Sequence, residues 1–213
     1  MKSRAKDTMP NVLLTLLSIL QALALELLWS HLQIADYLFE GDWTRLTFGM
    51  QILATFMGIL VIWVIYATNV MRFRWVPRIS DSVLPFFVGI NQFMLIEMLG
   101  PGNQGWWFIL LAAVFGLMHG TVQLMMRRAR LDGDNDAFFQ NVSPATLKDF
   151  YPTILIVLSL SGLGAYLLAR PDAELIALIG ALGAFALLSY QLYSVSYFWN
   201  RTMSSDEEQV GSG

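Results

Sequence analysis

The sequence predicts an all-α integral membrane protein with six transmembrane helices. Of its 213 residues, 56% are hydrophobic and only 14% are charged, whereas soluble domains are about 45–50% apolar and about 25% charged. The charges gather in short blocks between apolar runs, and about 20 apolar residues suffice to cross a bilayer. This composition makes the lipid bilayer the expected partner, and a net charge of −3 argues against a nucleic-acid partner.

Six apolar runs predict the six helices, which we place in one membrane domain over residues 1–203. They cover residues 11–35, 47–71, 82–100, 105–127, 152–169 and 174–199. The third and fifth runs are short, and they begin near Pro85 and Pro152. These prolines are compatible with a helix start, because a first helical turn tolerates proline. The first run follows basic residues as a signal peptide would, but its length favours a retained span.

Lysine and arginine are distributed unevenly between the predicted connections. Eleven of the thirteen would lie on one side of the membrane, and only Arg45 and Arg170 on the other. The positive-inside rule then predicts cytoplasmic termini, a cytoplasmic loop over residues 131–149 and a place in the bacterial inner (plasma) membrane. Residues 204–213 are expected to be a disordered tail, and the final Gly-Ser-Gly is typical of a cloning remnant.

The 131–149 loop contains the acidic run DGDND, which suggests calcium binding. An EF-hand needs glycine at its sixth position and glutamate at its twelfth. Ala137 occupies the sixth position counted from Asp132, so we expect a solvated acidic linker. The following segment, FFQNVSPATLKDF, is a candidate for a short interfacial helix.

Weak internal similarity suggests three tandem helical hairpins. An aspartate with a proline three or four residues after it precedes each odd-numbered span, and each even-numbered span ends in arginine. Gln21 and Glu26 in the first span have the same spacing as Gln92 and Glu97 in the third. Proline and arginine are common at span ends, so the repeat remains a hypothesis.

The first span carries a polar stripe inside an apolar helix. At 100° per residue its members share one face: Thr15, Ser18, Ala22, Glu26, Ser30 and Gln33. A charge within hydrocarbon costs about 2.5–3.5 kcal/mol, so Glu26 should find a partner other than lipid. Glu26 and Glu97 are therefore candidate proton or cation sites. The alternatives are a structural hydrogen bond and, for Glu97, emergence at the membrane surface.

The fourth span places His119 and Gln123 on one face with Gly116 and Gly120. Small residues four apart allow another helix to approach closely, so both polar side chains should point into a helix contact. His119 would relay protons to a carboxylate or, alternatively, fix the packing by a hydrogen bond. The two histidines of the chain lie at different depths, so we expect no haem, metal or other cofactor.

Further polar residues are candidates for lining a pore or a cytoplasmic vestibule. They are Ser18, Ser30, Tyr66, Asn69, Tyr190 and Ser194. The hydroxyl-rich face of the last span serves equally well as a packing seam.

The function that these features predict is a small channel or transporter for protons, cations or a small solute. The alternative is a non-transporting scaffold or a subunit of a larger membrane complex. Either function is compatible with a homo-oligomer or a membrane partner protein, because Asn91 and Gln92 make the third span polar on a second side. The chain has no cysteine, no Gly-x-Ser-x-Gly motif and no phosphate-binding glycine loop, so we expect no enzyme.

Overall fold

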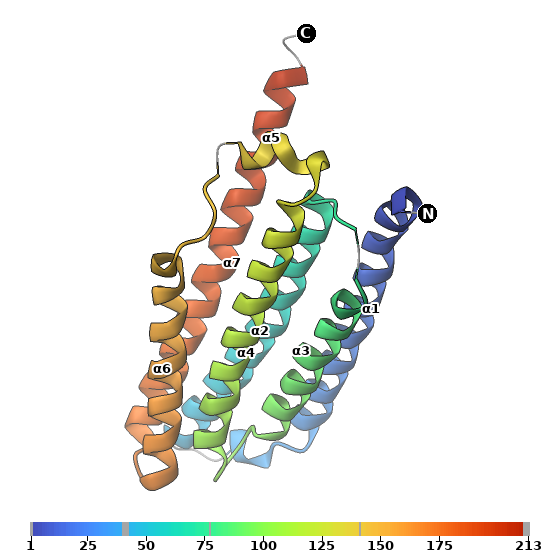
Figure 1. The fold of residues 1–213 in the computed structure, drawn as a ribbon. Coiled ribbons are helices and arrows are strands. Elements are labelled where there is room, and N and C mark those ends of the chain that lie inside the picture. Colours follow the sequence, from blue (N-terminus) through green and yellow to red (C-terminus); the bar gives the residue numbers. More distant parts are fainter. Residues whose placement is uncertain (1, 40–42, 77, 141, 211–213) are drawn as a thin grey trace.

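The computed structural model describes residues 2–39, 43–76, 78–140 and 142–210, and these residues form an all-helical bundle (Figure 1). Side chains are described within these ranges except at residues 2, 43, 44, 79, 82 and 201–210. Strands are absent from this part of the chain. The predicted all-α class is therefore confirmed.

Six long helices and three short ones make up the described chain. The long helices are α1 (Lys2–Gln33), α2 (Trp43–Arg72), α3 (Ile79–Glu97), α4 (Gln104–Ala129), α6 (Leu147–Ala169) and α7 (Glu174–Val210). The short ones are η1 (Asp36–Leu38), η2 (Gly133–Asn135) and α5 (Asp136–Phe139). We expected disorder from residue 204, but helix α7 continues to Val210. A helix that has formed adds further residues at little cost. Residues 211–213 of that tail lie outside the described residues.

Five of the long helices have the length and apolar composition of a membrane span: α1, α2, α4, α6 and α7. Helix α3 is shorter, and its apolar stretch is Val83–Glu97. Fifteen residues rise about 22 Å, less than the hydrocarbon thickness of about 30 Å. Gly100 follows this helix with a φ of +101°, a conformation that favours glycine and ends the helix early. Length and composition thus support five spans, not the six predicted.

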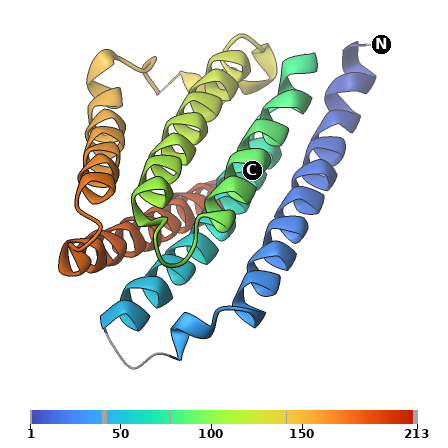
Figure 2. The ribbon, with the colours of Figure 1, turned by 90° about the horizontal axis from the view of Figure 1, so that it is seen from below.

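The helices form two layers. Helices α1, α3, α4 and α6 lie side by side in one layer, and α2 and α7 lie across it (Figure 2). The start of α1 and the end of α7 lie at one end of the bundle (Figure 1), which we call the basic end because Arg74 and Arg128 lie there. The other end, which carries the α1–α2, α3–α4 and α6–α7 connections, is called the turn end.

The third predicted hairpin is not a packed pair of helices. Helix α6 packs along α4, and α7 packs along α2, whereas α6 and α7 diverge from the turn that joins them (Figure 2). Glycine contacts explain the divergence: a Cβ atom on Gly164 would lie 2.6 Å from the carbonyl oxygen of Gly105, so α6 lies directly on α4. Near the turn, Gly180 of α7 admits Leu163 of α6 in the same way.

The close helix contact predicted at Gly116 and Gly120 does not form. Both glycines are exposed. A Cβ atom on Gly120 would meet no atom within 4 Å, and one on Gly116 would meet only Val157, at 3.9 Å. The close approach of α6 occurs nearer the turn end, and by this level α6 has moved away from the glycine face of α4.

Ion pairs and hydrogen bonds tie the connections together at the basic end. The buried carboxylate of Asp81 pairs with Arg128 and accepts hydrogen bonds from the indole of Trp75 (3.0 Å) and the backbone N–H of Arg78 (2.9 Å). Each unit of charge is thereby compensated inside the protein, as a buried carboxylate requires. The α2–α3 connection is in this way anchored to the end of α4.

The 131–149 loop is docked and not a free linker. Asp132 and Asp134 pair with Lys6 of α1, at 2.6 and 3.2 Å. Buried Asn135 donates to the carbonyl of Ala129 (2.8 Å) and accepts from the backbone N–H of Arg74 (3.0 Å). The acidic run therefore stabilises loop packing. In the segment that we expected to be an interfacial helix, the described helical residues are the end of the four-residue α5 and the start of α6, which begins at Leu147.

Candidate functional site

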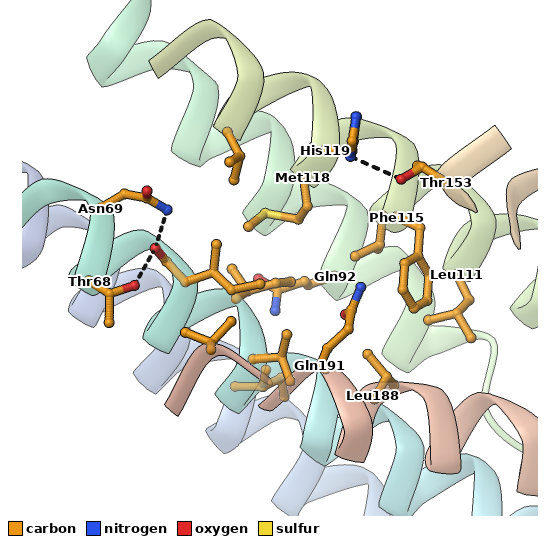
Figure 3. Close-up of a pocket in the computed structure, with 18 of the residues that line it drawn as sticks. Thr68, Asn69, Gln92, Leu111, Phe115, Met118, His119, Thr153, Leu188 and Gln191 are labelled. Atoms are coloured by element: carbon orange, nitrogen blue, oxygen red, sulfur yellow. Dashed lines mark hydrogen bonds between the residues drawn. The ribbon is translucent and has the colours of Figure 1, made fainter. Parts of the chain in front are cut away.

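A cavity of about 360 Å³ lies between the two layers, bounded mainly by α2, α4 and α7 (Figure 3). Its size falls in the lower part of the range for small-molecule sites, about 300–1,000 Å³. Most of its walls are aliphatic or aromatic. The polar side chains that line it are Thr55, Thr68, Asn69, Arg72, Gln92, His119, Thr153 and Gln191. None of the described lining residues is acidic.

The polar lining residues are distributed unevenly along the cavity. Toward the basic end, Asn69 and Arg72 come from α2 and His119 comes from α4, whereas Gln191 of α7 lies near Leu188 and Leu111, closer to the turn end (Figure 3). Toward the turn end, the walls are formed largely by apolar side chains, such as Phe115 on α4. We call the end that holds Asn69, Arg72 and His119 the polar end; elsewhere Thr55, Gln92 and Gln191 stand among the apolar side chains of the walls.

Several polar groups in the lining are already satisfied by the protein. The hydroxyl of Thr55 donates to the carbonyl of Gln51 (2.8 Å) and accepts from the indole of Trp107 (3.1 Å). The amide of Asn69 donates to the carbonyl of Ile65 at 2.7 Å. The side chain of Gln191, by contrast, makes no hydrogen bond with any described residue, so its donor and acceptor are available to a molecule in the cavity.

His119 stands at the polar end, and its contacts come from α6. Its Nδ1 shares a 2.9 Å hydrogen bond with the hydroxyl of Thr153 (Figure 3), and its ring lies edge-on to Phe150. Its Nε2 is buried and has no partner among the described residues. This arrangement matches the alternative of a hydrogen bond to a neighbouring helix. The carboxylate that a proton relay would need is absent from the described contacts of the ring.

Glu26 and Glu97 lie outside the cavity. Both are exposed, and neither makes a hydrogen bond or ion pair within the described chain. Gln21 and Gln92 explain their positions: their buried amides exchange two hydrogen bonds of 3.0 and 3.1 Å between the parallel helices α1 and α3. Each glutamate follows its glutamine by five residues, so both rise about 7.5 Å beyond the pair, toward the turn end.

This register places Glu26 level with the end of α3, where the chain leaves the bundle. The whole polar stripe of α1 faces outward, because α1 buries the opposite face, with Leu13, Leu17 and Ala24, against its neighbours. Our expectation that the bundle would supply a partner for Glu26 was therefore wrong. Both carboxylates lie on the outer surface of the bundle, and emergence at the membrane surface, the alternative for Glu97, stays a prediction.

The remaining candidate residues are dispersed. Ser18 is exposed and accepts a 3.3 Å hydrogen bond from the indole of Trp63, and Ser30 is also exposed. Tyr66 is buried and donates to the carbonyl of Asp81 at 3.3 Å. Of the predicted lining residues, the cavity includes Asn69, together with His119 from the ion-binding set. The candidates that do not line the cavity are Ser18, Ser30, Tyr66, Gln123, Tyr190 and Ser194. Of these, Tyr190 is exposed on the bundle surface.

Sequence reasoning missed Gln191, Thr153 and Thr68 as cavity residues. Nothing in their own spacing distinguishes them from polar residues that satisfy themselves within a helix. Gln191 does lie one residue from Tyr190 in a polar run, but that run was read as a face centred on tyrosine. The Gln92 amide was recognised as polar on a second side, and that side is the one joined to α1.

No group of three or more histidine or acidic side chains suited to a metal ion occurs among the described residues. No protein-family model, curated protein or solved structure matches this chain. The cavity is therefore the feature from which a function can be argued.

Proposed function

We propose that this protein is a small membrane transporter whose solute occupies the cavity between α2, α4 and α7. The observation that supports this most is the cavity itself: it has the volume of a small-molecule site, apolar walls and a few convergent hydrogen-bonding groups. A packing defect of this size would instead be costly, because interiors are normally filled to crystal density.

The electrostatics of the lining favour a neutral or anionic solute over protons or cations. A cation in a low-dielectric site needs a counter-charge, and no described acidic side chain lines the cavity. Arg72 provides positive charge at the polar end. We therefore retain the small solute from our prediction and set aside a pathway through Glu26.

We further propose that α3 crosses the membrane as a sixth span and that the basic end is cytoplasmic. Helix α3 runs between α1 and α4 in the same layer (Figure 2), and Pro101 and Gly102 then turn the chain back. The excess of lysine and arginine at the basic end favours a cytoplasmic side there. A bacterial inner membrane would suit this topology.

Blocking the cavity tests the transport proposal. A Cβ atom on Gly58 would meet only Leu188, at 4.0 Å, so Gly58→Phe places a ring in the cavity with little distortion of the helix. Gly183→Phe is the matched control, because a Cβ atom there meets nothing within 4 Å and the position is exposed.

The assay measures the uptake of radiolabelled benzoate and of radiolabelled indole into proteoliposomes, and a pH dye inside them reports proton flux. We expect Gly58→Phe to stop flux of the organic solute and Gly183→Phe to leave it intact. Proton or cation flux that disappears in Glu26→Gln, together with no flux of an organic solute that Gly58→Phe blocks, would refute transport through the cavity.

A non-transporting subunit remains the second candidate, and one observation favours it. The outward polar stripe of α1, including Glu26, is a surface that a partner helix would satisfy better than lipid does. Pull-down of a stoichiometric partner that protects Glu26 from carbodiimide labelling, together with an absence of flux, would favour the subunit.

A further inference from the structure

We propose that the solute pathway continues from the cavity toward the turn end as far as Gln51, and that the amide of Gln51 binds an uncharged solute there. This inference rests on the proposed function, to which it adds a second binding position and a solute class. It follows from the burial of Gln51, its place on α2 and the contact that separates it from the cavity.

Gln51 is a polar side chain without a partner in the interior of the bundle. It is 0% exposed, and its Nε2 and Oε1 atoms are both buried with no hydrogen bond to any described residue. The other buried glutamines, Gln21 and Gln92, satisfy each other. Because buried polar groups normally have a protein or water partner, Gln51 marks a position where a bound molecule would complete the hydrogen bonds.

Gln51 lies on the side of α2 that faces the cavity. At 100° per residue it falls within the arc of α2 residues that line the cavity, and it precedes the first of them, Thr55, by one helical turn. Helix α7, which packs along α2, carries no polar side chain between Glu174 and Ser189. The amide therefore extends the lining toward the turn end by one turn, into a stretch where α7 supplies no partner.

A single contact separates Gln51 from the cavity. On α4 the lining begins at Leu111. Trp107, one turn earlier, is fully buried and donates its indole N–H to the hydroxyl of Thr55 at 3.1 Å. The Thr55–Trp107 contact thus closes the cavity toward the turn end. Rotation of the indole away from Thr55 would join the cavity to the buried amide, so this contact is the gate of the pathway.

The surroundings of Gln51 suit an uncharged solute. Helix α2 carries no charged residue between Arg45 and Arg72, and α4 carries no aspartate, glutamate, lysine or arginine before Arg127. An ion at this position would lose its hydration without gaining a counter-charge. The amide of Gln51 presents N–H donors and a carbonyl acceptor. A neutral molecule with both a donor and an acceptor, such as an amide or an alcohol, therefore complements it.

Cysteine accessibility tests the pathway, because the chain has no cysteine of its own. Full-length Gln51→Cys in vesicles is treated with N-ethylmaleimide, a small uncharged reagent that reacts with the thiolate form of cysteine. Ile52→Cys is the matched control, because Ile52 is the next residue, is 7% exposed and does not line the cavity. We expect Gln51→Cys to react at least tenfold faster. Equal rates would overturn the pathway.

The same reaction tests the route by which the reagent reaches this position. Adding Gly58→Phe to Gln51→Cys should slow the reaction at least fivefold, because the phenylalanine ring fills the cavity above the gate. Adding Gly183→Phe should leave the rate unchanged. Equal rates in the two double variants would show that Gln51 is not reached through the cavity, and would overturn the inference.

Binding of radiolabelled benzamide to the full-length protein in micelles tests the solute class. Gln51→Leu should weaken the displaceable binding at least tenfold. Unlabelled benzoate, an anion of similar shape, should displace benzamide at least tenfold less well than unlabelled benzamide does. Gln51→Leu should also unfold at the same or a higher SDS content than wild type, because it removes an unpaired buried amide. Absent or unchanged benzamide binding, equal displacement by benzoate, or a less stable Gln51→Leu would overturn the site.

The outcomes separate this inference from the transport proposal. Uptake of benzoate or indole that Gly58→Phe stops, together with an unreactive Gln51→Cys, would preserve transport through the cavity and refute the site at Gln51. A reactive Gln51→Cys and benzamide binding that depends on Gln51, without uptake of any organic solute, would preserve the site and refute transport.

Discussion

Replacing Gln92 by methionine tests the pair of buried amides that joins α1 to α3. The wild-type pair makes two hydrogen bonds, and Gln21 is only 4% exposed. In Gln92→Met, the amide of Gln21 loses both partners and stays buried, which costs about 1–3 kcal/mol. Single interhelical hydrogen bonds in membranes contribute about 0.6 kcal/mol on average and up to about 1.7 kcal/mol. The loss of two such bonds is therefore consistent with a cost of about 1–3 kcal/mol.

Each single substitution should destabilise the protein, and the double substitution should restore stability. Gln92 is only 2% exposed, so in Gln21→Met its amide is also left buried without a partner. Removing both amides leaves no unsatisfied group, so Gln21→Met/Gln92→Met should be nearly as stable as wild type. The coupling energy of this double-mutant cycle should therefore exceed about 1 kcal/mol.

The assay is reversible unfolding in mixed micelles by increasing SDS, followed by tryptophan fluorescence. Additive losses in the two single variants, with a double variant as unstable as their sum, would refute the argument. That result would mean that each glutamine contributes through packing, not through the hydrogen bonds that they exchange.

Three further predictions concern other contacts in the fold. Arg128→Met should destabilise the protein by about 3–5 kcal/mol in the same SDS titration, because it leaves a buried carboxylate unpaired, whereas exposed Arg127→Met should cost little. Gly164→Leu should destabilise by at least about 1–3 kcal/mol through a clash with the α4 backbone; a matching loss in Gly120→Leu would contradict this assignment of the close contact. A hydrogen bond from Lys6 lowers the pKa of Asp132. The stabilisation that this pair gives the folded protein is therefore complete above the unfolded carboxyl pKa of about 3.9, and it is lost as the pH falls through the lower pKa of the folded state. A spin label in the same loop should gain mobility only below about pH 4, and constant mobility down to about pH 2 would oppose the prediction.

The basic-end ion pairs show how far sequence patterns reach. The aspartates that precede the odd-numbered spans and the arginines that end the even-numbered ones were recognised as a possible repeat. In the structure, Asp7 pairs with Arg74 and Asp81 with Arg128, so the start and end of each of the first two hairpins are joined. The pattern marked the residues correctly, but the pairing required knowing which helix ends meet. Asp149 instead accepts hydrogen bonds from Thr146 at the start of its own helix.

The candidate site was less accessible to sequence reasoning than the fold. A polar residue in an apolar helix is easily identified, and Glu26, Glu97 and His119 were selected on that ground. Whether such a residue faces the interior depends on the helix neighbours. On α1, the leucine face packs inside and the glutamate face outside, which is the reverse of what a buried polar stripe would require.

The sequence alone determined the membrane class, the approximate position of each long helix and the segregation of positive charge, because these depend on composition and run length. The tertiary structure decided which faces are buried, how α6 and α7 diverge and where the cavity lies. The physical reason is that lipid is as apolar as leucine, so no hydrophobic force selects which side of a membrane helix packs. Close glycine contacts such as Gly105–Gly164 and the fit of side chains between helices make that selection, and neither is visible in hydropathy.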